Sequence, residues 1–173
     1  PRPVAAREAP GLAEAMGRAA ATLTTSSLQP THRTGRTKQM RRSTKYASRI
    51  AAAFPAMRPS LDELLARLEE LHAGDTTDRL RPIHGAPHPH QWLLDVDGGL
   101  GLVDFDGFAF GPPELDVATF VAEMEYENPD RMPVTAIIDG FRTGYEQVAG
   151  PMDDAVLRAY VAHKRLAKAQ RNA

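Results

Sequence analysis

Two side chains that could bind a metal ion flank a segment with the pattern of a β-hairpin. Gln91 comes directly before the apolar run WLLDV, and Asp104 follows the second apolar run, LGLV. The turn signal Asp97-Gly98-Gly99 lies between the two runs. Since the two ends of a hairpin meet, we expect Gln91 and Asp104 to lie within reach of one divalent cation. Oxygen ligands of this kind suit Mg²⁺, which proteins hold through one or two groups together with phosphate oxygens.

Three histidines precede this hairpin and leave a second interpretation open. His84, His88 and His90 are close in sequence, so a zinc hydrolase built on them is an alternative. Zinc sites normally need further ligands at defined spacings, and the prolines among these histidines predict an irregular loop. Asp106 is a further candidate, as a metal ligand or as a partner of one. Asp95 is expected to serve the hairpin turn.

Helical patterns on both sides of the polar segment would have to position it. Ser60 and Glu63 form a capping-box pattern before a leucine-rich helix that Gly74 would end. In the preceding helix a stripe from Met40 to Phe54 is apolar, and the two helices are expected to pair antiparallel. LRPIHG is a short strand candidate. The other expected helices span about residues 10–23, 37–54, 114–126, 134–148 and 153–170.

Length and composition fit one ordinary domain of the α+β class, mainly helical. The chain has 173 residues, of which 42% are hydrophobic and 25% charged, and it contains no cysteine. Disulfides and thiolate metal sites are therefore excluded, and we expect a cytoplasmic protein. No apolar run approaches the roughly 18 residues that a membrane span needs, so no membrane partner is expected.

Charge is distributed unevenly although the net charge is only −1. Residues 15–61 hold nine Lys and Arg and no acidic residue, whereas residues 82–130 hold ten Asp and Glu and no Lys or Arg. The basic block predicts a solvated helix face. Tyr46 is almost its only aromatic residue, so we expect no nucleic-acid partner. The acidic block coincides with the polar segment, and clustered carboxylates need a cation among them.

The segments HGAPHPHQWLLD and GLVDFDGFAFGPPELDVATF resemble the signature of the aminoglycoside phosphotransferase and choline kinase-like family. The family pattern is roughly H-G-D-x-H-x-x-N, a hairpin, D-F-[DE], then G-x-P-x-x-D-[LV]-A. The resemblance extends from Arg81 to Phe120 and implies a protein-kinase-like fold. The chain would be the large C-terminal lobe, helical in residues 1–80 and 111–173, with the catalytic loop and hairpin in 81–110.

The same resemblance implies roles for individual residues. His84 would brace the catalytic loop, and His88 matches the second histidine of the motif. Gln91 stands where the family usually has a metal-binding Asn. Asp104 would be the main Mg²⁺ ligand, bridging the phosphates of ATP. Asp116 would hold the loop through hydrogen bonds to its backbone.

Ala86 departs from the family pattern. The family has an aspartate at this position, which accepts the proton of the substrate hydroxyl. A methyl group cannot do so, and general bases typically contribute about 10²- to 10⁴-fold in rate. The resemblance therefore implies a kinase catalytic loop that has lost its base, with weak or no turnover. A non-enzymatic binding module of the pseudokinase type is the alternative.

The small lobe of such kinases has no counterpart in this sequence. No glycine-rich loop follows a strand, and no G-x-x-x-x-G-K-[ST] motif is present. The resemblance implies that a small lobe in the same longer chain, or in a partner chain, would complete the ATP site. The acceptor would be a hydroxyl of a sugar, aminosugar or amino alcohol. Glu123, Glu125 and Glu127 would suit a cationic acceptor, although a solvated helix end explains them equally well.

Overall fold

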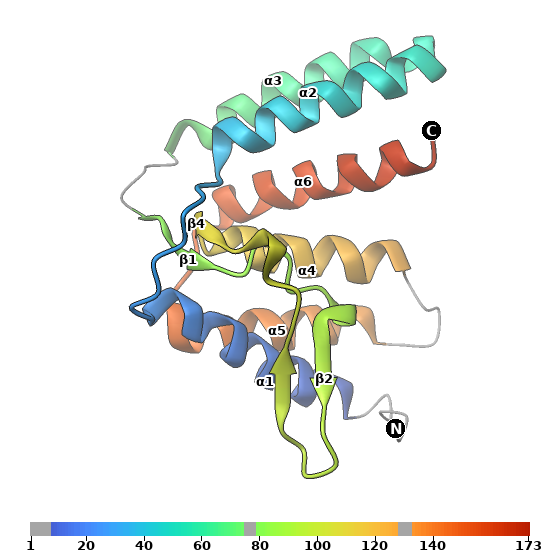
Figure 1. Ribbon diagram of the computed structural model, residues 1–173. Helices are drawn as coiled ribbons and strands as arrows, with labels where there is room; N and C mark the ends of the chain where they lie inside the picture. Colours follow the sequence, from blue (N-terminus) through green and yellow to red (C-terminus); the bar gives the residue numbers. More distant parts are fainter. Residues whose placement is uncertain (1–7, 75–78, 128–132) are drawn as a thin grey trace.

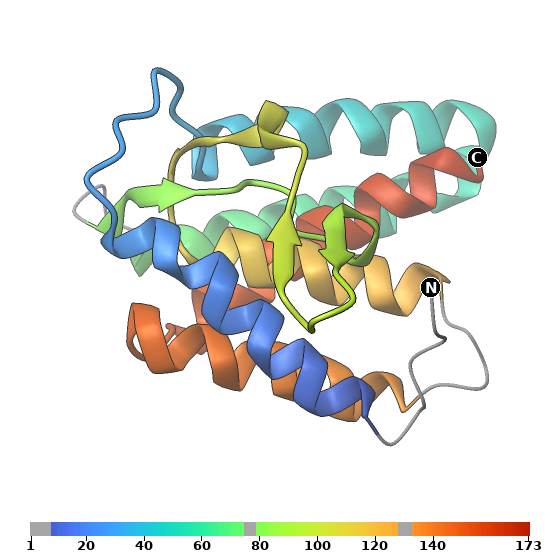
Figure 2. The same cartoon turned by 60° about the horizontal axis from the view of Figure 1, so that its bottom comes forward.

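The computed structural model describes residues 8–74, 79–127 and 133–173, which are mainly helical, as predicted, and include two small sheets. Figure 1 shows the helices stacked in layers: the α2–α3 pair, then α6, then α4, then α5 with α1. The strands lie along one side of this stack (Figure 1 and Figure 2). The helices are α1 (Ala9–Ala21), α2 (Arg36–Ala53), α3 (Arg58–Leu71), α4 (Glu114–Glu127), α5 (Val134–Ala149) and α6 (Asp154–Arg171); the strands are β1 (Arg81–Ile83), β2 (Trp92–Leu94), β3 (Leu100–Leu102) and β4 (Ala109–Gly111).

The predicted hairpin is present. β2 and β3 pair antiparallel, with Trp92 opposite Leu102. The Asp95 carboxylate closes the turn, because its Oδ1 accepts hydrogen bonds from the backbone N–H of Asp97 at 2.9 Å and of Gly99 at 2.6 Å. The second sheet pairs β1 with β4, a strand that the sequence analysis missed. β4 is only three residues long and follows three residues of 3-10 helix, so it carries no alternating pattern.

Two apolar clusters hold the stack together. The larger one joins α1, α4, α5 and α6, and in it the rings of Phe120 and Phe141 stack with centroids 3.9 Å apart. The smaller one joins α2, α3 and α6 around Ile50, Leu61 and Leu166. None of the helices in the described ranges is both long and apolar enough to span a membrane.

Helices α1 and α5 touch through their backbones. A side chain at Gly17 would meet the carbonyl oxygen of Phe141, and one at Gly144 would meet that of Glu14. Glycine is therefore required on both helices at their closest approach. This contact brings a segment near residue 15 onto one near residue 144, and it closes the lower end of the stack (Figure 1).

Two details of the expected α2–α3 hairpin are wrong. The capping box does not form, because α3 already begins at Arg58 with Pro59 in its first turn, so that Ser60 lies inside the helix. Phe54 is 49% exposed rather than buried, because α2 ends at Ala53 and the extended backbone of Phe54 turns its ring outward. The antiparallel pairing of the two helices is as predicted.

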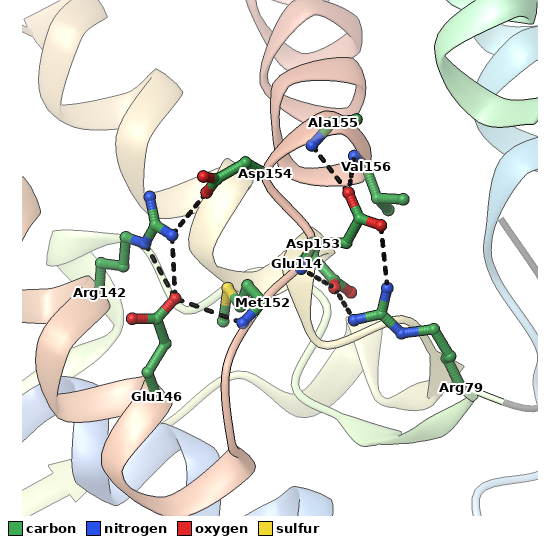
Figure 3. Close-up of polar contacts among 9 residues, drawn as sticks. All are labelled: Arg79, Glu114, Arg142, Glu146, Met152, Asp153, Asp154, Ala155 and Val156. Carbon is green, nitrogen blue, oxygen red and sulfur yellow. Dashed lines mark hydrogen bonds and ion pairs between the residues drawn. The ribbon is translucent and has the colours of Figure 1, made fainter. Parts of the chain in front are cut away.

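A polar network fixes the starts of α4 and α6 (Figure 3). The fully buried Glu114 pairs with Arg79, and its Oε1 also accepts the backbone N–H of Asp153 at 3.1 Å. Asp153 caps α6 by accepting the N–H groups of Ala155 at 2.8 Å and Val156 at 3.2 Å. These bonds tie both helices to the segment before β1, and so to the loop that carries the predicted site.

Candidate active site

The loop from His84 to Gln91 is clamped by one buried carboxylate. Asp116, in the first turn of α4, accepts the backbone N–H of His84 at 3.1 Å and that of Gly85 at 2.6 Å. The hydroxyl of Tyr145 donates a third hydrogen bond, at 3.2 Å. Burial raises the pKa of Asp116 to about 6, although the three hydrogen bonds oppose the rise. Gly85 has φ +85° and lies against the backbone of Gly107, so the loop needs glycine there.

The fully buried His84 braces the loop from inside. Its Nε2 lies 3.0 Å from the carbonyl oxygen of Val103, and its Nδ1 accepts the N–H of Ala86 at 3.3 Å. These two bonds require the neutral tautomer with the proton on Nε2. Burial lowers the pKa of His84, which agrees with a neutral ring.

Gln91 and Asp104 meet at the open end of the hairpin. The Gln91 amide Nε2 donates to Asp104 Oδ2 at 2.8 Å, and the Asp104 side chain faces solvent. Asp104 has φ +65°, the only positive φ among the non-glycine residues that the structure describes. Such strain at a polar residue is typical of a functional position.

This pair fits a magnesium ion. Turning the Gln91 amide about its last bond would present an oxygen where the nitrogen now lies, so both side chains can offer oxygen to one cation. Hard oxygen donors, one of them a carboxylate, are the ligands that Mg²⁺ prefers. Asp106 does not take part in this contact. It is exposed, and it lines a small cavity of about 130 Å³ with Gly85 and Lys164.

A larger cavity of about 420 Å³ opens beside Ala86, between α2, α4 and α6. Ala86 and His88 form one of its walls, and Glu123 of α4 lines it as well. His88 also connects the cavity to the hairpin, since its Nε2 lies 3.2 Å from Gln91 Nε2. Burial lowers the pKa of His88, so its ring is neutral at pH 7. Among the described residues that line this cavity, Glu123 is the only carboxylate, and it contacts Lys168.

The three histidines do not form the alternative zinc site. Both ring nitrogens of His84 are engaged in the loop, and the His90 ring turns away to pair with Glu127 at 2.7 Å. Within residues 8–74, 79–127 and 133–173, no group of three or more His, Asp or Glu side chains could hold a metal.

The three glutamates expected to suit a cationic acceptor are all paired. Glu123 contacts the ammonium of Lys168, and Glu127 contacts His90. Both oxygens of Glu125 accept from Arg165, at 2.6 and 2.7 Å. These carboxylates therefore have partners within the chain and do not form a free acidic surface.

Sequence reasoning missed the basic wall of the large cavity. Arg42 from α2 and Lys164, Lys168 and Arg171 from α6 line it. The spacing of 164, 168 and 171 places these residues on one helical face, and this signal was readable in the sequence. The position of Arg42 at the cavity could not be read from the sequence, because nothing there shows which face of α2 meets α6.

Comparison with known proteins agrees with this geometry. The model of a phosphotransferase enzyme family, APH, matches residues 2–151. A comparison with curated protein sequences gave no significant match.

Three solved structures share the fold. A spectinomycin phosphotransferase, APH(9)-Ia, in complex with ADP and spectinomycin is 16% identical with a TM-score of 0.62; the match covers 90% of this chain and 52% of that one. An aminoglycoside-3'-phosphotransferase of type VIII is 19% identical with a TM-score of 0.65, over 92% and 62% of the two chains. Aminoglycoside phosphotransferase APH(3'')-Id from Streptomyces rimosus ATCC10970 is 20% identical with a TM-score of 0.65, over 94% and 64%. The chain thus spans about half to two thirds of the length of these proteins.

Proposed function

Because the chain belongs to the phosphotransferase enzyme family, we propose that it is the large lobe of a small-molecule kinase. The reaction would move the γ-phosphate of ATP to a hydroxyl group of a small acceptor. The observation that carries this proposal is the contact between Gln91 and Asp104, 2.8 Å apart at the open end of the hairpin and next to the clamped loop. Two oxygen-bearing side chains, one of them held in a strained backbone conformation, suit a metal that bridges nucleotide phosphates.

Each part of the site would have a separate task. Asp104 and Gln91 would hold Mg²⁺, which when bound neutralises charge on the phosphate oxygens. Asp116 and His84 would fix the loop, so that the acceptor hydroxyl meets the phosphate in one orientation. Positioning of this kind is the main contribution of a protein to phosphoryl transfer.

Ala86 limits what this chain can do. An aspartate at this position would lie in the wall of the large cavity, where it could accept the proton of the acceptor hydroxyl. Its loss would remove about 3 to 5 kcal/mol of transition-state stabilisation. We therefore expect slow turnover. Ala86 is also the observation that favours the second candidate, a pseudokinase module that binds its ligand without reaction.

A small lobe would complete the nucleotide site, either in the same longer chain or in a partner. The hairpin exposes large apolar side chains: Leu93 is 61% exposed, Leu94 51% and Val96 100%. Apolar side chains at this density on a two-stranded hairpin are unusual for a free surface. They support the proposal that the hairpin packs against protein or nucleotide in the complete enzyme.

Calorimetric titration with Mg²⁺ and ATP tests the proposal. Asp104→Asn is the informative variant, because asparagine tolerates the left-handed backbone while the carboxylate charge is removed. We expect it to weaken Mg²⁺-dependent ATP binding at least tenfold, about 1.4 kcal/mol. Asp97→Asn, an exposed carboxylate of the hairpin turn, is the matched control and should bind as the wild type does.

The outcomes separate the two candidates. Binding that is lost in Asp104→Asn but kept in Asp97→Asn supports a kinase lobe. Equal binding by the wild type and Asp104→Asn contradicts the metal site. No binding by either protein favours the module without nucleotide chemistry.

A further inference from the structure

The large cavity beside Ala86 carries more positive charge than its surroundings can neutralise. Four cationic side chains line it, from Arg42, Lys164, Lys168 and Arg171, against one carboxylate, that of Glu123. Glu123 is already engaged with Lys168. No hydrogen bond or ion pair joins Arg42, Lys164 or Arg171 to another residue in the described part of the chain. Three cations therefore face one cavity without a partner.

Repulsion between these crowded cations is unfavourable, and a bound anion could relieve it. Burial and, to a lesser extent, the nearby charges of Arg42 and Lys168 together lower the pKa of Lys164 to about 8. The negative charges of Asp116 and Glu123 act in the opposite direction but do not balance these effects. Asp116 is fully buried and is used to clamp the loop. An anion in the cavity would reverse the repulsion between the cations.

The position of the cavity relates it to the reaction. His88 lines the cavity and lies 3.2 Å from Gln91, which in turn contacts Asp104. Neither Gln91 nor Asp104 lines the cavity itself. His88 thus links the cavity to the metal pair, and Ala86 lies in the cavity wall. Its volume of about 420 Å³ lies in the range of small-molecule sites.

We propose that this cavity binds the phosphoryl acceptor through an anionic group, a carboxylate or a phosphate, on a small polyhydroxy compound. As the acceptor site it rests on the proposed function; as an anion site it rests only on the cationic lining. An acceptor with protonated amines would be repelled by the same side chains. The inference therefore replaces the cationic acceptor considered from the sequence.

A set of hexose derivatives that differ mainly in charge tests the proposal by calorimetry. Glucose is neutral, glucosamine is cationic, gluconate is a carboxylate and glucose 6-phosphate is a phosphate ester. We expect at least one of the two anions to bind at least tenfold more tightly than glucose, with glucosamine weakest. The comparison of gluconate with glucose 6-phosphate distinguishes the two anionic groups.

Variants locate the binding. Arg42→Gln and Arg171→Gln change exposed side chains that line the cavity, and each should weaken anion binding at least fivefold. Arg41→Gln changes an exposed neighbour on α2 that does not line the cavity, and it should leave binding unchanged. Because all three side chains are exposed, the variants should fold, which circular dichroism would check.

Several results would overturn the proposal. One is that the four compounds bind with equal affinity, or that none of them binds at millimolar concentration. Another is an equal loss of affinity in Arg41→Gln. A third is displacement of the bound anion by Mg²⁺ and ATP, because the cations would then serve the nucleotide phosphates.

The same measurements test the proposed kinase function independently of the anion site. If the anion binds but Mg²⁺ and ATP do not, the kinase proposal fails while the anion site stands. If Mg²⁺ and ATP bind and no anion preference exists, the anion site fails while the kinase proposal stands.

Discussion

Three buried side chains that are linked by hydrogen bonds make the stability of this fold sensitive to acid. His163 on α6 lies 2.6 Å from the Ser43 hydroxyl through its Nδ1 and 2.9 Å from His72 Nε2 through its own Nε2. It is 2% exposed and joins α6 to α2 and to the turn after α3. Burial and, to a lesser extent, the nearby charges of His72 and Lys164 together lower the pKa of His163 to about 3.

The sign of the pH effect follows from comparing the pKa of His163 in the folded and the unfolded chain. The folded pKa lies below the unfolded value, so the unfolded chain takes up the proton first as the pH falls. The stabilising contribution of neutral His163 is thus complete above about pH 7.5, and it decreases as the pH falls below the unfolded value of about 6.5. Each pH unit below that value costs about 1.4 kcal/mol, which amounts to about 2 kcal/mol at about pH 5.

Asp116 partly hides this loss in the wild type. Its folded pKa of about 6 lies above the unfolded value of 3.8, so the folded state takes up this proton first and is stabilised as the pH falls. At about pH 5 this gain is about 1.4 kcal/mol. The lowered pKa values of His84 and His88 act in the opposite direction to Asp116, so the wild-type curve does not isolate the effect of His163 and a variant is needed.

Urea unfolding at constant ionic strength, followed by circular dichroism, measures the difference. His163→Gln removes the titrating ring and keeps a polar side chain. Between about pH 7.5 and about pH 5, we expect the free energy of unfolding of His163→Gln to fall by about 2 kcal/mol less than that of the wild type. His32→Gln, which changes an exposed histidine, should follow the wild type. If His163→Gln loses as much stability as the wild type over this range, the buried neutral ring is not the cause.

Three further changes test other parts of the structure. Gly144→Ala should destabilise the fold by about 1–3 kcal/mol in urea unfolding, because the new methyl group meets the backbone of α1, whereas Gly11→Ala, in open space, should be neutral or stabilising by up to about 1 kcal/mol. Arg79→Met should lower the free energy of unfolding by about 2–4 kcal/mol by leaving a buried glutamate unpaired, while Arg67→Met, in an exposed pair, should change it by less than about 1 kcal/mol. Ala86→Asp, in an enzyme that includes the small lobe, should raise phosphoryl transfer at least tenfold in a coupled ADP assay, and an unchanged rate would contradict the loss of a base.

Structure could be predicted from the sequence most closely where the whole pattern lies within one contiguous segment. The hairpin could be predicted because its turn residues and both apolar runs are contiguous, and so could the meeting of Gln91 with Asp104. The helices of the second half could be predicted to within one or two residues, because proline and aspartate mark their starts.

Features that depend on packing between distant elements were not predictable. β4 is a strand because it pairs with β1, and Arg42 lies at the cavity because of the way α2 packs on α6. The hydroxyl of Tyr145 reaches Asp116 across 29 residues of sequence. Each of these contacts needs a three-dimensional neighbour that local sequence pattern does not specify.

The close contact between α1 and α5 has a consequence for how the protein assembles. About 110 residues separate the end of α1 from the start of α5, so this pairing is among the most non-local in the chain. During synthesis α1 leaves the ribosome long before α5, so its apolar face, with Ala13, Met16 and Ala20, lacks its main partner until then. Tyr145 lies on the same late helix and holds the carboxylate that clamps the loop. The nascent chain therefore cannot complete the hydrogen bonds of Asp116, or cover this face of α1 with α5, until α5 has been made.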